Sequence, residues 1–216
     1  MKHNFKTTLA TLALTLTSLT SFAQEFTGLV EGKDYIKSKI SDTVINTAQT
    51  KPGVVEFFWY GCGHCYKMKP LAAKLFSKYN GKIVAEQYPV AFPSWESGTR
   101  MFFAYKEMGI FNKMHDKTFD EIHKNNKNIL SDNKVRDIFL TQNGVDVAKF
   151  NSSYNSFNMS RNLLKAKNIV DSHKIAGSPI YAVYSRGYTY QVSPVTAGGY
   201  ERTIDILDTI IQQKLK

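Results

Sequence analysis

The sequence of 216 residues predicts an α/β fold that carries an inserted all-helical domain. Three observations support this prediction. A continuous apolar run at residues 54–60 leads directly into helical spacing, which is typical of a buried strand followed by a helix. Apolar residues then recur at helical spacing from about residue 94 to residue 173. A hairpin pattern and an amphipathic helix close the chain.

The first 23 residues have the composition of a secretory signal peptide. Lys2 and Lys6 give a basic start, residues 7–20 carry leucines and no charge, and the triplet Ser-Phe-Ala at 21–23 fits a small-x-small cleavage site. We therefore expect cleavage before Gln24. The alternative is an uncleaved anchor, but the threonines make the segment weakly apolar and short for a membrane span.

Charge and cysteine content narrow the possible functions. The formal net charge is +10, but the lysines are scattered and form no dense basic run, so we expect no nucleic-acid partner. The length suits one domain, or one domain with a large insertion. In an exported protein, two cysteines only three positions apart are not expected to serve as a disulfide that stabilises the fold.

Both cysteines lie where the run at residues 54–60 meets the following helix, in the sequence Cys62-Gly63-His64-Cys65. A thiol at a helix N-terminus faces unpaired N–H groups and the positive end of the helix dipole, which both stabilise the thiolate. Cys62 is therefore the predicted acidic, exposed nucleophile, and Gly63 leaves the approach to it open. Cys65 is the predicted resolving thiol. The His64 imidazole is expected to stabilise the charged sulfur further.

Three other interpretations of this CGHC sequence compete with redox chemistry. A structural disulfide between Cys62 and Cys65 would close too short a loop to remove much entropy from the unfolded chain. A zinc site would lack a second cysteine or histidine pair. A copper site would use both cysteines with Met68 or His64, because soft sulfur ligands suit Cu(I). Redox chemistry is favoured, and we expect no metal and no organic cofactor, only a redox-active disulfide.

A glutamate stands inside the predicted buried strand. Glu56 lies six residues before Cys62, at a place where an ionised carboxylate is costly to bury. A buried carboxyl with a raised pKa would accept and return the proton that Cys65 exchanges when it attacks or is released. The alternative is that the Glu56 side chain escapes to the edge of the sheet and has no chemical role.

Local patterns place the elements around the cysteines. An edge strand is expected at residues 34–36, and a turn at 51–53 leads into the central strand. Pro70 should bend the helix that follows the cysteines, and the Asn-Gly pair at 80–81 should end that helix. Residues 82–90 then form the next strand, with a proline near its end.

Residues 94–173, which we call the helical block, show spacing typical of four or five helices, with an N-cap pattern at 131–132. The methionine and aromatic content of the block indicates a core rather than a ligand site. His115, His123 and His173 are isolated on such helices, and we assign them no chemical role.

After the helical block, predicted strands at 180–184 and 188–192 flank the turn Ser185-Arg186-Gly187. Two glycines at 198–199 precede the last helix, whose apolar side chains share one face. These side chains are Ile204, Leu207, Ile210, Ile211 and Leu215.

Together these features resemble a known family. The strand, the Cys-x-x-Cys pair, the helix with Pro70 and a Ser178-Pro179 step before a hairpin and a terminal helix resemble the thioredoxin fold. The inserted helices, the signal peptide and Glu56 narrow the resemblance to the DsbA family of periplasmic disulfide oxidases. The segments VRDIFLTQNGV and YNSF extend it over nearly all of the chain that follows the signal peptide.

The resemblance implies a thioredoxin fold with an inserted all-helical domain. The thioredoxin-like domain would be discontinuous, at residues 24–93 and 174–216, and residues 94–173 would be the inserted domain. The implied activity is that of a monomeric thiol-disulfide oxidoreductase that donates a disulfide to reduced, newly exported proteins in the periplasm. A DsbB-like, quinone-linked membrane protein would reoxidise it.

The same resemblance implies roles for individual residues. Cys62 corresponds to the nucleophile of the family, Cys65 to its buried partner and Glu56 to its acidic strand residue. Pro179 corresponds to a cis-proline that faces the disulfide. Ser178 before it would offer backbone groups to an extended substrate peptide.

The chain departs from the family at two positions. Gly63 is expected to lie with Ser178 and Pro179 at the substrate-binding surface. The best-known oxidases have proline at the position of Gly63, and Gly-His is the pair found in protein disulfide isomerases. Ser178 stands where valine or threonine is usual. A disulfide isomerase or reductase with the same cysteines is therefore one alternative function. A periplasmic copper-binding or chaperone-like protein is another.

Overall fold

The computed structural model of the protein describes residues 25–39 and 51–215. The predicted signal peptide and its cleavage site lie outside these residues. Among the residues described, no helix combines the length and the apolar character needed to cross a membrane.

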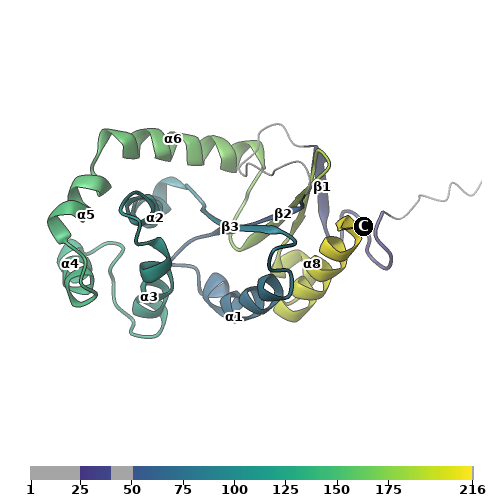
Figure 1. The fold of residues 1–216 in the computed structure, drawn as a ribbon, viewed down its shortest axis with the longest axis horizontal. Helices are drawn as coiled ribbons and strands as arrows, with labels where there is room; N and C mark the ends of the chain where they lie inside the picture. The colour runs from purple at the N-terminus through teal and green to yellow at the C-terminus, as the bar shows by residue number, and fades with distance from the viewer. Residues whose placement is uncertain (1–24, 40–50, 216) are drawn as a thin grey trace, which may run out of the picture.

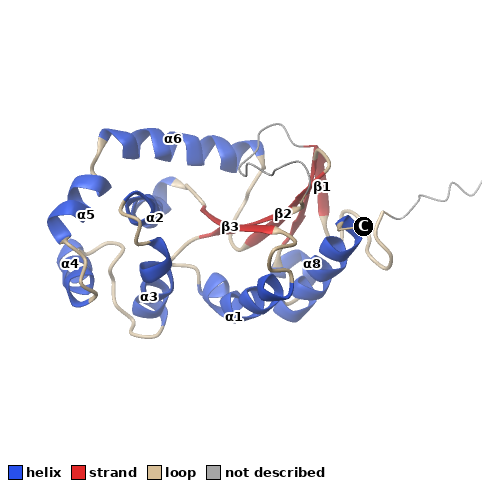
Figure 2. Ribbon diagram, in the orientation of Figure 1, coloured by secondary structure: helices blue, strands red, loops and turns tan. Residues whose placement is uncertain are grey.

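A five-stranded mixed sheet forms the centre of the fold (Figure 1 and Figure 2). Its spatial order is β1 (Ile36–Lys39), β5 (Tyr188–Val192), β4 (Ile180–Ser185), β2 (Gly53–Phe58) and β3 (Val84–Pro89). β2 runs parallel to β3 and antiparallel to β4. Every residue of β2 is buried, as its continuous apolar run predicts, because helices cover both faces of the sheet.

Helices surround the sheet and extend beyond it (Figure 1). In chain order they are α1 (Gly63–Lys78), the 3-10 turn η1 (Pro93–Trp95), α2 (Glu96–Glu107), α3 (Phe111–His123), α4 (Asn133–Gln142), α5 (Val147–Tyr154), α6 (Phe157–Ser172), α7 (Pro194–Ala197) and α8 (Tyr200–Lys214). α1 and α8 pack side by side on one face of the sheet, and α6 packs on the other. Side chains alternate along β2, so Val54 joins the core under α1 and α8, whereas Val55 and Phe57 join the core under α6.

The helical block contains α2 to α6, which agrees with the predicted four or five helices. Its methionine and aromatic side chains form a core, as predicted; the buried members include Met101, Phe102, Tyr105, Met114, Phe119, Phe139, Phe150 and Met159. This core also contains Phe58, Tyr60 and Cys65. The block therefore shares its interior with the end of β2 and the start of α1, and the division into two domains stays a prediction.

The three histidines of the helical block have structural partners. His115 Nδ1 forms a hydrogen bond of 3.1 Å with the hydroxyl of Tyr60, and His123 Nε2 donates to the Tyr60 carbonyl at 2.8 Å. His173 Nδ1 donates to the Ile169 carbonyl at 2.9 Å. Two of the three therefore hold the residue that leads from β2 toward the cysteines.

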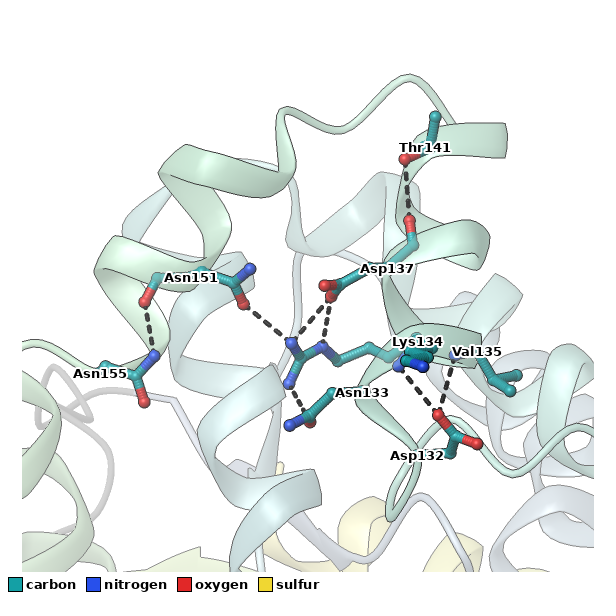
Figure 3. Close-up of polar contacts among 9 residues, drawn as sticks. Asp132, Asn133, Lys134, Val135, Asp137, Thr141, Asn151 and Asn155 are labelled. Carbon is teal, nitrogen blue, oxygen red and sulfur yellow. Dashed lines mark hydrogen bonds and ion pairs between the residues drawn. The ribbon is translucent and has the colours of Figure 1, made fainter.

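α4 begins at the predicted N-cap. The side chain of Asp132 accepts hydrogen bonds from the backbone N–H groups of Lys134 and Val135, at 2.9 and 3.2 Å (Figure 3). These bonds satisfy donors that have no partner inside the first turn of the helix.

A buried arginine joins α4 to α5, in the network drawn in Figure 3. Arg136 is 5% exposed, and its guanidinium donates to the Asp137 carboxylate at 2.8 and 3.0 Å. It also donates to the side-chain oxygens of Asn133 at 2.9 Å and Asn151 at 2.8 Å. The ring of Tyr154 lies 4.9 Å from the guanidinium carbon. Every nitrogen of this buried charge therefore has an acceptor.

The edge strand differs from its prediction. β1 is Ile36–Lys39 rather than residues 34–36, because Asp34 closes the turn before the strand. The Asp34 carboxylate accepts from the Val30 N–H at 2.9 Å and from the Arg202 guanidinium at 2.6 Å. The contact between Asp34 and Arg202 of α8 therefore keeps Asp34 in the turn, although the local sequence pattern favours a strand there.

Two other boundaries also differ. α1 ends at Lys78, slightly before the predicted 80–81, and Gly81 adopts a φ of +75° in the turn that leads to β3. The short α7 is absent from the sequence prediction. Ser193 and Thr196 form a capping box that makes this single turn stable.

Candidate active site

Cys62 ends a tight turn between β2 and α1 and caps the helix. Its N–H donates to the Trp59 carbonyl at 3.0 Å, and its sulfur accepts from the Cys65 N–H at 3.2 Å. The sulfur thus occupies the place that a serine or aspartate oxygen takes at other helix N-termini. The helix begins at the cysteine pair, as the sequence predicts.

Gly61 leaves space for the ring of Trp59. A Cβ at position 61 would lie 2.5 Å from ring carbons of Trp59, and that ring is stacked on Trp95 with centroids 4.6 Å apart. Gly61→Ala is therefore expected to displace the start of α1 and to lower the free energy of unfolding by about 2 kcal/mol. Urea denaturation measures the change. The control is Gly63→Ala, which meets no atom within 4 Å; equal values for both variants would contradict the expected clash.

The surroundings of Cys62 favour its thiolate. Hydrogen bonding with the Cys65 thiol lowers the pKa of Cys62 from 9.0 to about 5, although burial acts in the opposite direction. The backbone N–H groups of Cys65 and His64 lower the pKa further. The stabilisation expected at a helix N-terminus is therefore present as hydrogen bonds to the sulfur.

Cys65 is fully buried in the core that it shares with the helical block. Burial raises the pKa of the Cys65 thiol, and the neighbouring Cys62 raises it further. The two sulfurs are not bonded to each other, so the structure represents the dithiol form. The site therefore pairs an acidic, half-exposed sulfur with a buried sulfur that stays protonated.

Titration of the reduced protein is expected to show one thiol that ionises near pH 5. Because this folded pKa lies below that of an unfolded thiol, the thiolate stabilises the fold fully above about pH 9, and this contribution is lost as the pH falls through about 5. At pH 7 part of this contribution is present, reduced by solvent screening because Cys62 is half-exposed. Thiolate absorbance gives the pKa, and urea unfolding of the reduced and oxidised forms gives the contribution. A stability difference between the forms that stays constant over this range would contradict the expectation.

The Ser178–Pro179 peptide bond is cis and lies beside the cysteines. In its protonated form, the Cys62 thiol donates to the Ser178 carbonyl at 3.3 Å. The cis form that the family resemblance implies is therefore present. Gly63 is exposed, so the approach to Cys62 is open, as expected. The roles of Gly63, Ser178 and Pro179 in binding a substrate stay predictions.

His64 is bound by the start of α8. Its Nδ1 forms a hydrogen bond of 2.6 Å with the hydroxyl of Tyr200, and the two ring centroids lie 6.0 Å apart. The backbone N–H of His64 contributes to the low pKa of Cys62. Because the imidazole is directed to α8, its own effect on the sulfur stays a prediction.

Glu56 is buried in β2, with 3% of its surface exposed. The alternative in which its side chain escapes to the edge of the sheet is therefore wrong. Burial raises the pKa of Glu56 to about 7, although Tyr181, Gln87 and Lys69 favour the ionised form. A carboxyl that titrates near neutrality is suited to exchanging a proton with a thiol. That role stays a prediction.

A cavity of about 730 Å³ reaches Glu56 between α1, α3 and β3. Its apolar lining includes Phe76 and Phe111, and its charged lining includes Lys69 and Asp116. The cavity gives solvent a route to the buried carboxyl from the side of the sheet that α1 covers.

The two candidate third ligands of the copper alternative have contacts of their own. Met68 is buried in the core under α1 and α8, whereas Cys65 belongs to the core of the helical block. The His64 ring is held by Tyr200. Across residues 25–39 and 51–215, no group of three or more histidine, cysteine, aspartate or glutamate side chains could hold a metal ion.

Sequence reasoning misses the tyrosines that contact the site. Tyr181 reaches Glu56 from β4, and Tyr200 reaches His64 from α8. Both contacts join segments more than a hundred residues apart. The alternation along 180–184 limits Tyr181 to one face of its strand, but its partner depends on how β4 pairs with β2.

The chain is similar to thiol:disulfide interchange proteins. It is 31% identical to DsbA of Pseudomonas aeruginosa over 205 residues, or 94% of each chain. It is 30% identical to DsbA of Burkholderia cepacia over 210 residues, or 96% of this chain and 97% of that relative. A crystal structure of P. aeruginosa DsbA matches with a TM-score of 0.72 and 33% identity over 84% of this chain and 92% of that one.

A DsbA structure from Xylella fastidiosa, which is 21% identical, also has the fold. Its TM-score is 0.72, over 86% of this chain and 97% of that chain. No protein-family model matches the sequence.

Proposed function

Since this chain belongs to the DsbA family of thiol:disulfide interchange proteins, we propose that Cys62 and Cys65 carry a disulfide that it donates to reduced exported proteins. The chain is a thiol-disulfide oxidoreductase with a thioredoxin fold and an inserted set of helices. One observation supports the direction of transfer. The half-exposed Cys62 is acidic, whereas Cys65 behind it is buried.

Transfer takes place in two exchanges. A substrate thiolate attacks the Cys62 sulfur of the oxidised enzyme, a mixed disulfide forms, and Cys65 leaves as a thiolate that takes a proton from Glu56. A second thiolate of the substrate then attacks the substrate sulfur of the mixed disulfide. The substrate gains its disulfide, and Cys62 leaves as a stable thiolate.

The low pKa of Cys62 favours donation because it stabilises the reduced enzyme. The fall in the pKa of Cys62 from 9.0 to about 5 keeps this sulfur ionised at pH 7, and stabilising the reduced form raises the reduction potential of the couple. The enzyme is therefore expected to be more oxidising than one with an ordinary thiol at the same position.

Equilibration with glutathione buffers tests this proposal. We expect a reduction potential well above that of thioredoxin, which is about −270 mV, together with rapid oxidation of a peptide that carries two thiols. A potential close to that of thioredoxin would overturn the oxidase assignment. Rearrangement of scrambled disulfides faster than peptide oxidation would instead favour the isomerase that the Gly-His pair suggests.

We further propose that the protein acts as a monomer in the periplasm and that a DsbB-like, quinone-linked membrane protein reoxidises it. The composition of residues 1–23 supports export, and the half-exposed Cys62 is accessible to a membrane partner. N-terminal sequencing of the exported protein is expected to begin at Gln24. Membrane vesicles that contain quinone are expected to reoxidise the dithiol, and vesicles stripped of quinone are not.

A further inference from the structure

A row of three polar side chains crosses the sheet behind the cysteines. Glu56 on β2 is the register partner of Gln87 on β3 and of Tyr181 on β4. Register partners point to the same face of a sheet, so both neighbours reach the Glu56 carboxyl. The central strand thus holds an acid between two neutral hydrogen-bonding groups.

Tyr181 makes a direct hydrogen bond to this acid. Its hydroxyl donates to Glu56 Oε1 at 3.1 Å, and both side chains are buried. Burial keeps the pKa of Tyr181 well above its ordinary value, and Glu56 raises it further, so the hydroxyl remains a donor. Cys62 and Cys65 lie close enough to raise the pKa of Tyr181 further when either is ionised.

The charged groups that face Glu56 come from α1, and those across the cavity come from α3. Lys69 on α1 favours the carboxylate, but its ammonium is paired with Asp116 on α3 at 2.7 Å. Cys62 disfavours the carboxylate when it is ionised. Burial lowers the pKa of His115 on α3 to about 3, so this residue is neutral near pH 7.

The lining of the same cavity includes further charged residues that are exposed to solvent. They are Lys67 and Asp120 on the helices and Glu86 on β3. Lys67 and Glu86 are exposed to solvent, and Asp120 accepts a hydrogen bond from the exposed Tyr66 hydroxyl at 3.0 Å. Solvent screens such groups. Of the two neutral donors beside Glu56, Gln87 on the edge strand β3 is half-buried, and Tyr181 is the one that lies wholly inside the core.

We propose that Tyr181 is a positioning residue: its hydroxyl holds the Glu56 carboxyl in place and sets the pH at which that carboxyl exchanges a proton with Cys65. This inference rests on the proton exchange of the proposed function and adds the group that regulates it. Tyr181 itself neither gains nor loses a proton.

The step affected is the resolution of a mixed disulfide. When reduced enzyme reacts with oxidised glutathione, the Cys62 thiolate first attacks one of its two sulfurs. The disulfide bond of oxidised glutathione breaks, one glutathione leaves as a thiolate, and the other stays joined to Cys62. Cys65 then gives its proton to the Glu56 carboxylate, and its sulfur bonds to the Cys62 sulfur. The bond to glutathione breaks, and glutathione leaves as a thiolate. This second step requires ionised Glu56, whereas the first step requires only the Cys62 thiolate.

Tyr181→Phe tests the proposal with little change of shape. A hydrogen bond to a carboxylate favours ionisation, so loss of the donor raises the pKa of Glu56. We expect the pH midpoint of the second step to rise by about one unit, which slows that step about fivefold at pH 7. Mixing with oxidised glutathione, quenching in acid and mass spectrometry resolves the two steps, and the first is expected to keep its rate.

The matched control is Tyr184→Phe. Tyr184 lies on the same strand and is buried, but its side chain belongs to the core under α6, and its hydroxyl has no hydrogen-bond partner in the described structure. We expect the parental pH profile for this variant. In a Glu56→Gln background, Tyr181→Phe is expected to have no further effect.

Three outcomes would overturn the inference while the parent still forms its disulfide. They are an unchanged midpoint in Tyr181→Phe, an equal shift in Tyr184→Phe, and an undiminished effect of Tyr181→Phe in the Glu56→Gln background. Failure of the proposed function is a different result, because the parent protein would then form no disulfide with oxidised glutathione.

Discussion

Replacing Cys62 with alanine is expected to reduce oxidation of a two-thiol peptide to its uncatalysed rate. Without the Cys62 sulfur, the enzyme has no internal disulfide, and the remaining Cys65 is buried and protonated. Cys65→Ala is expected to behave differently, because the acidic sulfur of Cys62 stays accessible. This variant should accumulate mixed disulfides through Cys62 that cannot be resolved from within the enzyme.

The two variants act as controls for each other, because each removes one thiol from the same site. Non-reducing electrophoresis of cells that express each variant, followed by mass spectrometry of the adducts, measures trapping and identifies the substrates. Adducts on Cys62→Ala in place of Cys65→Ala would reverse the assignment of nucleophile and resolving thiol. Substantial peptide oxidation by Cys62→Ala would show that the chemistry lies elsewhere.

Arg136→Ala is expected to lower the free energy of unfolding by about 3 kcal/mol. The substitution removes every hydrogen bond of the guanidinium, including the one to Asn151 that joins α4 to α5, and it leaves the oxygens of Asp137 and Asn151 without their donor. It also removes the cation from the ring of Tyr154. Urea denaturation, followed by circular dichroism, measures the loss.

Arg161→Ala is the matched control for this prediction. Arg161 is an exposed arginine on α6 that hydrogen-bonds to Asn158 three residues away, and its removal is expected to cost less than about 0.5 kcal/mol. Equal losses for the two variants would mean that the network around Arg136 contributes no more than an ordinary surface arginine does.

The redox pair could be predicted from the sequence because its chemistry depends on neighbours along the chain. Four consecutive residues hold both thiols, and a strand that ends where a helix begins gives Cys62 the N-terminal N–H groups. The burial of Glu56 could be predicted for a similar reason, since it is a single acidic residue within a continuous apolar strand.

The rest of the site could not be predicted, because it depends on the order and register of strands. Tyr181 becomes the donor to Glu56 only when β4 pairs with β2 in one register, and Tyr200 reaches His64 only because α8 packs beside α1. The predicted bounds of β1 are wrong for the same reason, since Asp34 is hydrogen-bonded to Arg202, which lies near the other end of the chain. In each case the position of the residue depends on a contact with a segment that is distant in the sequence, and the local sequence pattern does not specify that contact.

The single core that joins Cys65 to the helices limits how far this enzyme could be simplified. An engineer who trimmed the chain to the sheet with α1 and α8 would remove the side chains of Met101, Phe119 and Met159, which belong to the same cluster as that sulfur. We expect that this truncated protein would not oxidise substrates as the full chain does. The Cys65 thiol would be exposed to solvent and could react with substrates as Cys62 does. The fixed order in which Cys62 reacts first and Cys65 second would then be lost.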